Sequence, residues 1–261
     1  CHNVLWKIDL DEGTKRPHST LWRSTGTDVP PGPPVGSSHG SGLGVITAEN
    51  GQQYGWGHKR VLYLRDGPVF KPIIEFMKDG VWMDVNDDQR RQEEEIHPVA
   101  DLGRRPHPIE WVDEGLTLYS ARTRTIFRPV KIREDGVPVY DFENPEKLPF
   151  GSYNPQGPTM FVDPHDGTLY QNHAPRDREA IGFARRRRNG DLIWGIRGTV
   201  FWKRTLSMPK PGKGDLYALT APLGVAGDFT GAATYYSGYH ILTREGVYVD
   251  MIMNPPPSEG L

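Results

Sequence analysis

Residues 84–95, Asp-Val-Asn-Asp-Asp-Gln-Arg-Arg-Gln-Glu-Glu-Glu, carry oxygen side chains at the spacing of a calcium-binding loop. Such a loop supplies side-chain oxygens from positions 1, 3, 5, 9 and 12 and a backbone carbonyl from position 7. Those positions are occupied here, in order along the chain, by Asp84, Asn86, Asp88, Arg90 (the backbone position), Gln92 and Glu95. Calcium takes about six to eight oxygen ligands, and the last carboxylate closes the shell with both oxygens. The segment therefore predicts a Ca²⁺ site.

Two features of this loop depart from the calcium pattern. Gln89 stands at position 6, where the pattern has a glycine that allows a sharp turn. Arg90 and Arg91 place positive charge beside a site for a cation. The alternative interpretation is therefore a solvated acidic turn that binds no metal.

The residues before the loop indicate how it is held. Val81–Met83 has the character of a strand and not of the entering helix of an EF-hand. We therefore expect the loop to brace a hairpin, and not to move a pair of helices in response to calcium.

The composition is that of an ordinary globular protein, with 261 residues, 36% apolar and 25% charged residues, and a formal charge of −2. Thirty glycines and twenty-four prolines favour many short elements joined by turns. Apolar runs of strand length recur along the whole chain, and we expect strands among others over residues 60–64, 69–76, 125–132 and 181–185. No run of about 18 apolar residues predicts a membrane span.

Turn dipeptides separate these strand-like runs, among them Asp66-Gly67, Asp135-Gly136 and Asn189-Gly190. Grouping the hairpins gives about six units of about 40 to 50 residues, the length of a four-stranded propeller blade. We expect an all-β fold, a β-propeller of about six blades that forms one domain over residues 1–261, with the loop 84–95 inserted in it. Closure of the propeller would require another segment or chain. A β-sandwich is the alternative.

Two segments carry a resemblance to a known group of proteins. Gly80-Val-Trp-Met-Asp-Val-Asn-Asp-Asp88 and His240-Ile-Leu-Thr-Arg-Glu-Gly-Val-Tyr-Val249 resemble parts of secreted bacterial β-propeller proteins with an inserted Trp-x-Asp-x-Asn-x-Asp-Gly loop. The resemblance implies an extracytoplasmic protein, in the periplasm, on the cell surface or secreted. It also implies a module that is often joined to cytochrome or carbohydrate-active modules. Gln89 stands where this pattern too has its glycine.

Cys1 is the only cysteine, so no disulfide can form within the chain. Three readings of it remain open: a cut site, a lipid-modified processed terminus, or the end of a haem-attachment motif, since His2 follows directly. A haem in an adjoining segment is therefore not excluded.

A run of four basic residues forms a second candidate site, for a polyanion: Arg185, Arg186, Arg187 and Arg188. The alternative is a solvated hairpin tip before the Asn189-Gly190 turn. Nucleic acid is not expected, because no aromatic residues interleave with the arginines and the net charge is close to zero.

No catalytic motif is visible, neither a Gly-x-Ser-x-Gly elbow nor a phosphate-binding loop. Residues that suit catalysis or metal binding by type alone are His107, His165, His173, His240, Asp113, Asp141, Asp228, Tyr235, Tyr236 and Tyr239. We expect a calcium-stabilised module that binds a protein partner or a glycan. The alternative is part of a secreted enzyme, carbohydrate-active or a haem-linked oxidoreductase, with its active centre at the propeller axis or in an adjoining chain.

Overall fold

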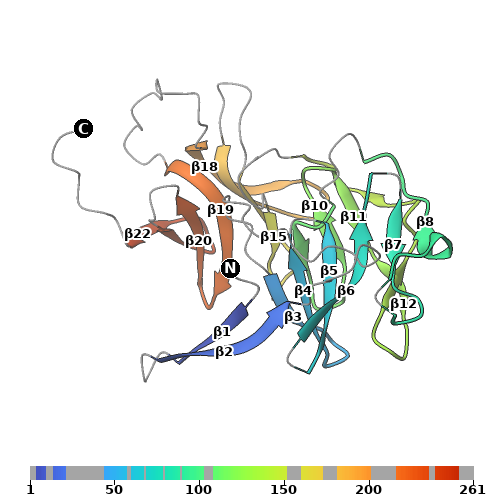
Figure 1. Cartoon of the computed structure of the whole chain (residues 1–261). Helices are drawn as coiled ribbons and strands as arrows, with labels where there is room; N and C mark the ends of the chain where they lie inside the picture. The colour runs from blue at the N-terminus through green and yellow to red at the C-terminus, as the bar shows by residue number, and fades with distance from the viewer. Residues whose placement is uncertain are drawn as a thin grey trace, which may run out of the picture. The chain divides into compact units, whose positions relative to one another are not determined.

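The computed structural model describes residues 4–9, 14–21, 44–57, 60–67, 69–78, 80–88, 90–102, 108–151, 160–172, 181–200, 216–234 and 239–252. The chain divides into two compact units, and each is described by itself. Unit 1 comprises Cys1–Tyr119 and Thr125–Glu146, and unit 2 comprises Ser120–Arg124 and Lys147–Leu261. In the described ranges the regular elements are strands and one short 3₁₀ turn, which confirms the expected all-β class (Figure 1).

The first sheet of unit 1 is an antiparallel meander with two hairpins added along its last strand. Its four central strands are β3 (Gly44–Thr47), β4 (Gln53–Gly57), β5 (Val61–Asp66) and β6 (Val69–Phe76). Strands β7 (Val81–Met83) and β8 (Ile96–His97) extend it as a hairpin, with the 3₁₀ turn η1 (Glu93–Glu95) between them. The hairpin of β1 (Val4–Asp9) and β2 (Thr14–Leu21) joins through a parallel pairing of β2 with β6.

The second sheet has four strands in the order β14-β11-β10-β9. They are β9 (Trp111–Val112), β10 (Leu118–Ser120), β11 (Thr125–Phe127) and β14 (Glu146–Lys147). A separate two-stranded hairpin, β12 (Pro129–Ile132) and β13 (Pro138–Tyr140), is inserted in the chain between β11 and β14.

Unit 2 consists of two further four-stranded meanders. The first contains β15 (Met160–Val162), β16 (Leu169–Asn172), β17 (Ile181–Arg186) and β18 (Leu192–Val200). The second contains β19 (Leu216–Ala226), β20 (Phe229–Thr234), β21 (Tyr239–Thr243) and β22 (Tyr248–Ile252). A parallel pairing of β18 with β19 joins the two.

The described residues thus contain four groups of four neighbouring strands that succeed one another along the chain, a propeller-like construction. The first group belongs to a sheet of eight strands, and the last two groups together form another. The sequence predicts about six such units, more than the four groups of strands in the described residues. Residues 4–21 supply only one hairpin, and β12–β13 is an insertion within a sheet and not part of a unit of its own. Hairpin counting in sequence cannot distinguish an inserted hairpin from half of a blade.

The strands form where the sequence predicts them because their residues suit a half-buried pleated surface. In β5, Val61, Leu62 and Tyr63 are all buried, and the strand ends at Asp66, where Gly67 takes a φ of 57°. A positive φ at the turn is accessible to glycine without steric cost. Gly136 does the same in the β12–β13 turn, with a φ of 89°.

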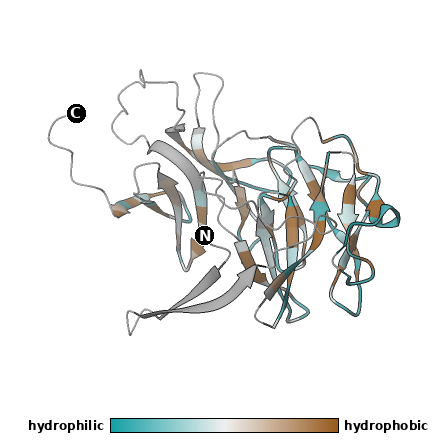
Figure 2. Cartoon of the chain, viewed as in Figure 1, coloured by the Kyte–Doolittle hydropathy of each residue, from teal (hydrophilic) through white to brown (hydrophobic). Residues whose placement is uncertain are grey.

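Aromatic side chains dominate the core of unit 1. Phe76 of β6 packs against Phe127 of β11 and against Phe142, with ring centroids 5.5 and 5.6 Å apart. These contacts join the first sheet to the second within the unit. Figure 2 shows the hydrophobic residues gathered on the strands and the hydrophilic ones on the connecting loops.

Candidate metal site

The predicted calcium loop lies between β7 and β8 of unit 1 (Figure 1). Asp84 directly follows β7, and its backbone N–H donates to the carbonyl of Ile73 at 3.0 Å, so the first loop residue is still attached to β6. Glu95 ends η1, one residue before β8 begins. Both ends of the loop are therefore fixed by the sheet, as expected for a loop that braces a hairpin.

Three carboxylates of the loop converge. One oxygen from each of Asp84, Asp88 and Glu95 lies within 4.8 Å of the other two. Calcium–oxygen distances are about 2.3–2.6 Å, so two ligands on opposite sides of one ion are about 4.6–5.2 Å apart. The spacing of the three oxygens fits a single calcium ion. Asp84 and Glu95 are each 2% exposed, whereas Asp88 lies at the surface.

Glu95 is held in place by two hydrogen bonds. The indole N–H of Trp82 donates to its Oε2 at 2.9 Å, and the backbone N–H of Val85 donates to its Oε1 at 3.0 Å. A carboxylate offers about four lone-pair sites, so both oxygens retain the capacity to bind a cation. The two donors, one on each oxygen, fix the orientation of the carboxylate.

Short hydrogen bonds within the loop shape the central ligands. The backbone N–H of Asp88 donates to Oδ1 of Asn86 at 3.0 Å, and the backbone N–H of Arg90 donates to Oδ1 of Asp88 at 2.8 Å. Gln92 donates its amide to Oδ2 of Asp88 at 2.5 Å. Asx turns of this type keep the chain tightly curved. Asp87 takes a positive φ of 59° in the same curve.

The two arginines of the loop do not act alike. Arg91 forms an ion pair with Glu75 of β6, a carboxylate that is 3% exposed and is also 3.7 Å from Arg60. The charge of Arg91 is thus compensated by a residue outside the loop. Arg90 is exposed, and its carbonyl accepts a 3.3 Å hydrogen bond from Trp82. Of the two positive charges in the loop, that of Arg91 is therefore balanced by an acidic side chain outside the loop.

The hairpin β12–β13 supports the loop from another side. Arg133, at the end of β12, donates to the carbonyl of Val85 at 2.6 Å and forms an ion pair with Asp135 at 2.5 Å. A guanidinium that contacts both the loop and its own turn fixes the distance between them.

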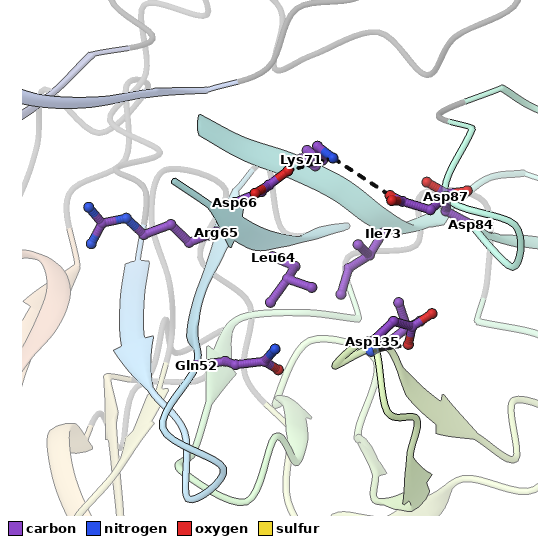
Figure 3. Close-up of a pocket in the computed structure, with 10 residues that line it drawn as sticks. Gln52, Leu64, Arg65, Asp66, Lys71, Ile73, Asp84, Asp87 and Asp135 are labelled. Atoms are coloured by element: carbon purple, nitrogen blue, oxygen red, sulfur yellow. Dashed lines mark hydrogen bonds and ion pairs between the residues drawn. The ribbon is translucent and has the colours of Figure 1, made fainter. Parts of the chain in front are cut away.

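A pocket of about 260 Å³ adjoins the candidate metal cluster, Asp84, Asp88 and Glu95, within unit 1. Its acidic rim consists of Asp66, Asp84, Asp87 and Asp135. Its apolar wall consists of Leu64, Ile73 and Val137. In Figure 3, Leu64 and Ile73 extend from the two neighbouring strands toward the space that Gln52 and Asp135 border, and Arg65 points away from it.

Lys71 bridges two carboxylates of the acidic rim, at 2.6 Å from Asp66 and 3.8 Å from Asp87 (Figure 3). Its hydrogen bond to Asp66 raises the pKa of the lysine. Partial burial lowers it, and the charges of Asp87 and Asp84 raise it again, so that it lies above its ordinary value. The pocket rim therefore stabilises positive charge.

The four arginines of the second candidate site separate. Arg185 forms an ion pair with Asp166 at 2.5 Å, and Arg186 donates to Gln171 at 3.1 Å. Arg187 and Arg188 are exposed at the turn. Arg188 also donates to the carbonyl of Gly167 at 3.3 Å, so three of the four cations are engaged inside unit 2. Polyanion binding by this run stays a prediction.

Arg185 belongs to a network around a buried carboxylate. Asp163 is fully buried and is 2.8 Å from Arg244 and 3.9 Å from Arg185. Arg244 lies in the β21–β22 turn, and its carbonyl accepts a 2.7 Å hydrogen bond from Trp194 of β18. The network joins the two meanders of unit 2, which gives these residues a structural role.

The remaining catalytic candidates have local partners. Asp113 accepts from the hydroxyl of Tyr119 at 2.8 Å, and Asp141 accepts from Asn144. His165 lies in the turn that Asp163 stabilises, and His240 is buried with its ring 5.9 Å from that of Tyr248. Asp228 is exposed in the β19–β20 turn and Tyr239 is half-buried in β21. Several candidates lie outside the described residues: Cys1, His2, Gln89, His107, His173, Tyr235 and Tyr236.

Among the described residues, Asp84, Asp88 and Glu95 are the one group of three acidic, histidine or cysteine side chains close enough to hold an ion. Sequence reasoning missed the residues that position this group, Trp82 and Arg133. A signal existed for the first, since Trp82 is the tryptophan of the Trp-x-Asp pattern. None existed for Arg133, which is 48 residues from Val85.

Comparisons with known proteins give similarities to solved structures, with low sequence identity in the example that follows. No family model matches the chain, and no curated protein matches it. The crystal structure of BamB from Moraxella catarrhalis is similar with a TM-score of 0.32 and 12% sequence identity, covering 95% of this chain. The chain spans 58% of the length of that protein. No helix in the described ranges is long and apolar enough to cross a membrane.

Proposed function

We propose that this chain is a calcium-stabilised β-propeller module of an extracytoplasmic protein, which binds a protein partner. The observation that carries the proposal is the convergence of Asp84, Asp88 and Glu95 within 4.8 Å at the end of a sheet hairpin. Asn86, Gln92 and the carbonyl of Arg90 complete the proposed ligand set, as the loop spacing predicts.

The role of the ion is structural. Asp84 is attached to β6 through its backbone, and Glu95 is attached to β7 through Trp82. An ion that binds both carboxylates would cross-link the two ends of the loop, and metal binding to a folded site adds to folding stability. This supports a rigid surface loop and not a calcium sensor.

The extracytoplasmic location rests on the resemblance of residues 80–88 and 240–249 to secreted bacterial propellers. Calcium concentrations outside the cell suit modules with affinities of about 10⁻⁴–10⁻³ M. A loop without the position 6 glycine belongs in that weak class. One continuous propeller over residues 1–261 is part of this proposal.

Terbium luminescence tests the metal site. Tb³⁺ replaces Ca²⁺ at oxygen sites, and an indole close to it transfers excitation energy to it. Trp82 donates directly to the ligand Glu95, so excitation of tryptophan is expected to give terbium emission that added calcium displaces. Asp88→Asn should remove the emission while Glu94→Gln, an exposed neighbour in η1, retains it. Emission that is equal in wild type and Asp88→Asn would overturn the proposal.

A further inference from the structure

The pocket beside the loop has a composition that selects for one kind of ligand. Four carboxylates form its acidic rim, and two basic side chains, Lys71 and Arg65, are the cations of its lining. Arg65 is directed elsewhere, with its guanidinium on the carbonyl of Gly67 at 2.9 Å and on the side chain of Gln53. The rim therefore carries an excess of negative charge.

The pocket also has an apolar side. The apolar wall is contributed by three different strands or turns, β5, β6 and the start of β13. A volume of about 260 Å³ is just below the range of about 300–1,000 Å³ for small-molecule sites, so it suits one side chain or a small ligand. An apolar wall beneath an acidic rim complements an alkyl stem that ends in a cationic group.

The acidic rim already binds one cationic side chain of the chain itself. Lys71 is shared between Asp66 and Asp87. Asp135, on the opposite element, has Arg133 as its partner. Because a carboxylate has about four lone-pair sites, each can accept further donors from an incoming group.

We propose that this pocket binds an arginine side chain of a protein partner, with the guanidinium at the acidic rim and the methylene stem on the apolar wall. A guanidinium has five donors in a planar fork, so it can contact carboxylates from more than one element at once. Asp66 lies at the end of β5 and Asp135 in the β12–β13 turn, so acceptors from separate elements line the pocket.

This inference names the chemistry of the partner and so rests on the proposed binding function, but not on the metal. Asp66, Asp87 and Asp135 lie outside the metal cluster. Asp84 is common to the pocket and the cluster, so a bound calcium ion would lower the negative charge at the rim. By linkage, the arginine ligand and calcium would each weaken the binding of the other.

The test titrates the whole chain with a blocked Gly-Arg-Gly tripeptide, once in saturating calcium and once in chelator, following the backbone amide signals of Gln52 and Val137 by NMR. Saturable shifts are expected with this probe and not with the matched Gly-Gln-Gly tripeptide. Asp66→Asn and Asp135→Asn should each weaken binding about fivefold, the effect of one part-exposed ion pair. Asparagine retains the Oδ1 that accepts the Val137 N–H in the turn, so the fold is preserved.

Glu134→Gln is the matched control, because it removes the same charge from the same turn at an exposed position outside the pocket. It should bind as wild type does. Absence of saturable binding, equal binding of the glutamine probe, or unchanged binding in both pocket variants would overturn the inference. If the terbium site fails while the arginine probe still binds, the metal is wrong and the pocket stands. If the probe fails in a protein that binds terbium, the pocket is wrong and the metal stands.

Discussion

The indole N–H of Trp82 donates to Oε2 of Glu95 across the calcium loop, at 2.9 Å and with neither side chain more than 2% exposed. This bond ties Glu95, the last proposed ligand, to the strand that precedes Asp84, the first one. The proposed ligands at the two ends of a twelve-residue segment are thereby held by the sheet and not by the loop alone.

Trp82→Phe should therefore weaken calcium binding. The substitution leaves a buried carboxylate oxygen without one donor, which costs about 1–3 kcal/mol of stability. Calcium affinity is expected to fall several-fold, and isothermal titration calorimetry measures it. Trp194→Phe is the control, because it removes a 2.7 Å indole hydrogen bond in unit 2 and should leave calcium affinity unchanged. Equal affinities of wild type and Trp82→Phe would show that Glu95 is positioned in another way.

Arg133→Met should loosen the loop without removing a ligand. The guanidinium that contacts the carbonyl of Val85 is lost, so hydrogen exchange of residues 85–88 in the calcium-free protein should become faster. Arg128→Met is the control, because Arg128 pairs with the exposed Glu146 at 2.5 Å, away from the loop. Identical exchange in wild type and Arg133→Met would contradict the bracing role of the β12–β13 hairpin.

Arg244→Met should destabilise unit 2. Asp163 is fully buried, and removal of its partner at 2.8 Å leaves it with Arg185 at 3.9 Å. Loss of one partner of a buried ion pair costs about 3–5 kcal/mol of folding stability. Because Arg244 is partly exposed, we expect a loss at the lower end, about 3 kcal/mol. Urea denaturation measures it. The double variant Asp163→Asn/Arg244→Met should recover part of the loss, and a double variant less stable than Arg244→Met would argue against the pair.

Stability of unit 2 should fall in acid. Partial burial raises the pKa of Asp166, but hydrogen bonds from Thr168 and the charges of Arg185 and Arg244 bring it below its ordinary value. A carboxylate with a lowered pKa in the folded state stabilises the fold above its unfolded pKa of about 3.9. That contribution is lost as the pH falls through the lower, folded pKa. Asp166→Asn should be less stable than wild type at pH 7 and should lose less between pH 4 and pH 2, as followed by denaturant titration.

Local signals in the sequence predict much of this fold. The strands with β-branched and aromatic residues were expected, among them β5, β6 and β17, and so were the turns at Gly67 and Gly136. The ligand spacing of residues 84–95 also required only the sequence, because the ligands are close along the chain.

Other elements were missed for physical reasons. Strand β20, Phe-Thr-Gly-Ala-Ala-Thr, has small residues because its neighbours approach closely: a Cβ on Gly231 would lie 3.3 Å from the carbonyl of His240. One strand was expected over residues 125–132, but the chain leaves the second sheet at Arg128, and Pro129 begins the separate hairpin. The residues that line the pocket are spread along the chain from Gln52 to Val137, and no local sequence pattern predicts that they lie close together.

The melting temperature of unit 1 in calcium and in chelator is the most direct measurement of the structural metal. At a free calcium concentration about 100 times the dissociation constant, binding adds about 2.7 kcal/mol to the free energy of unfolding, and the transition should rise by several degrees. The rise should persist in Glu94→Gln and disappear in Asp88→Asn, which retains the Oδ1 that accepts the Arg90 N–H. A melting temperature of the wild type that is the same in calcium and in chelator would contradict a calcium-stabilised loop.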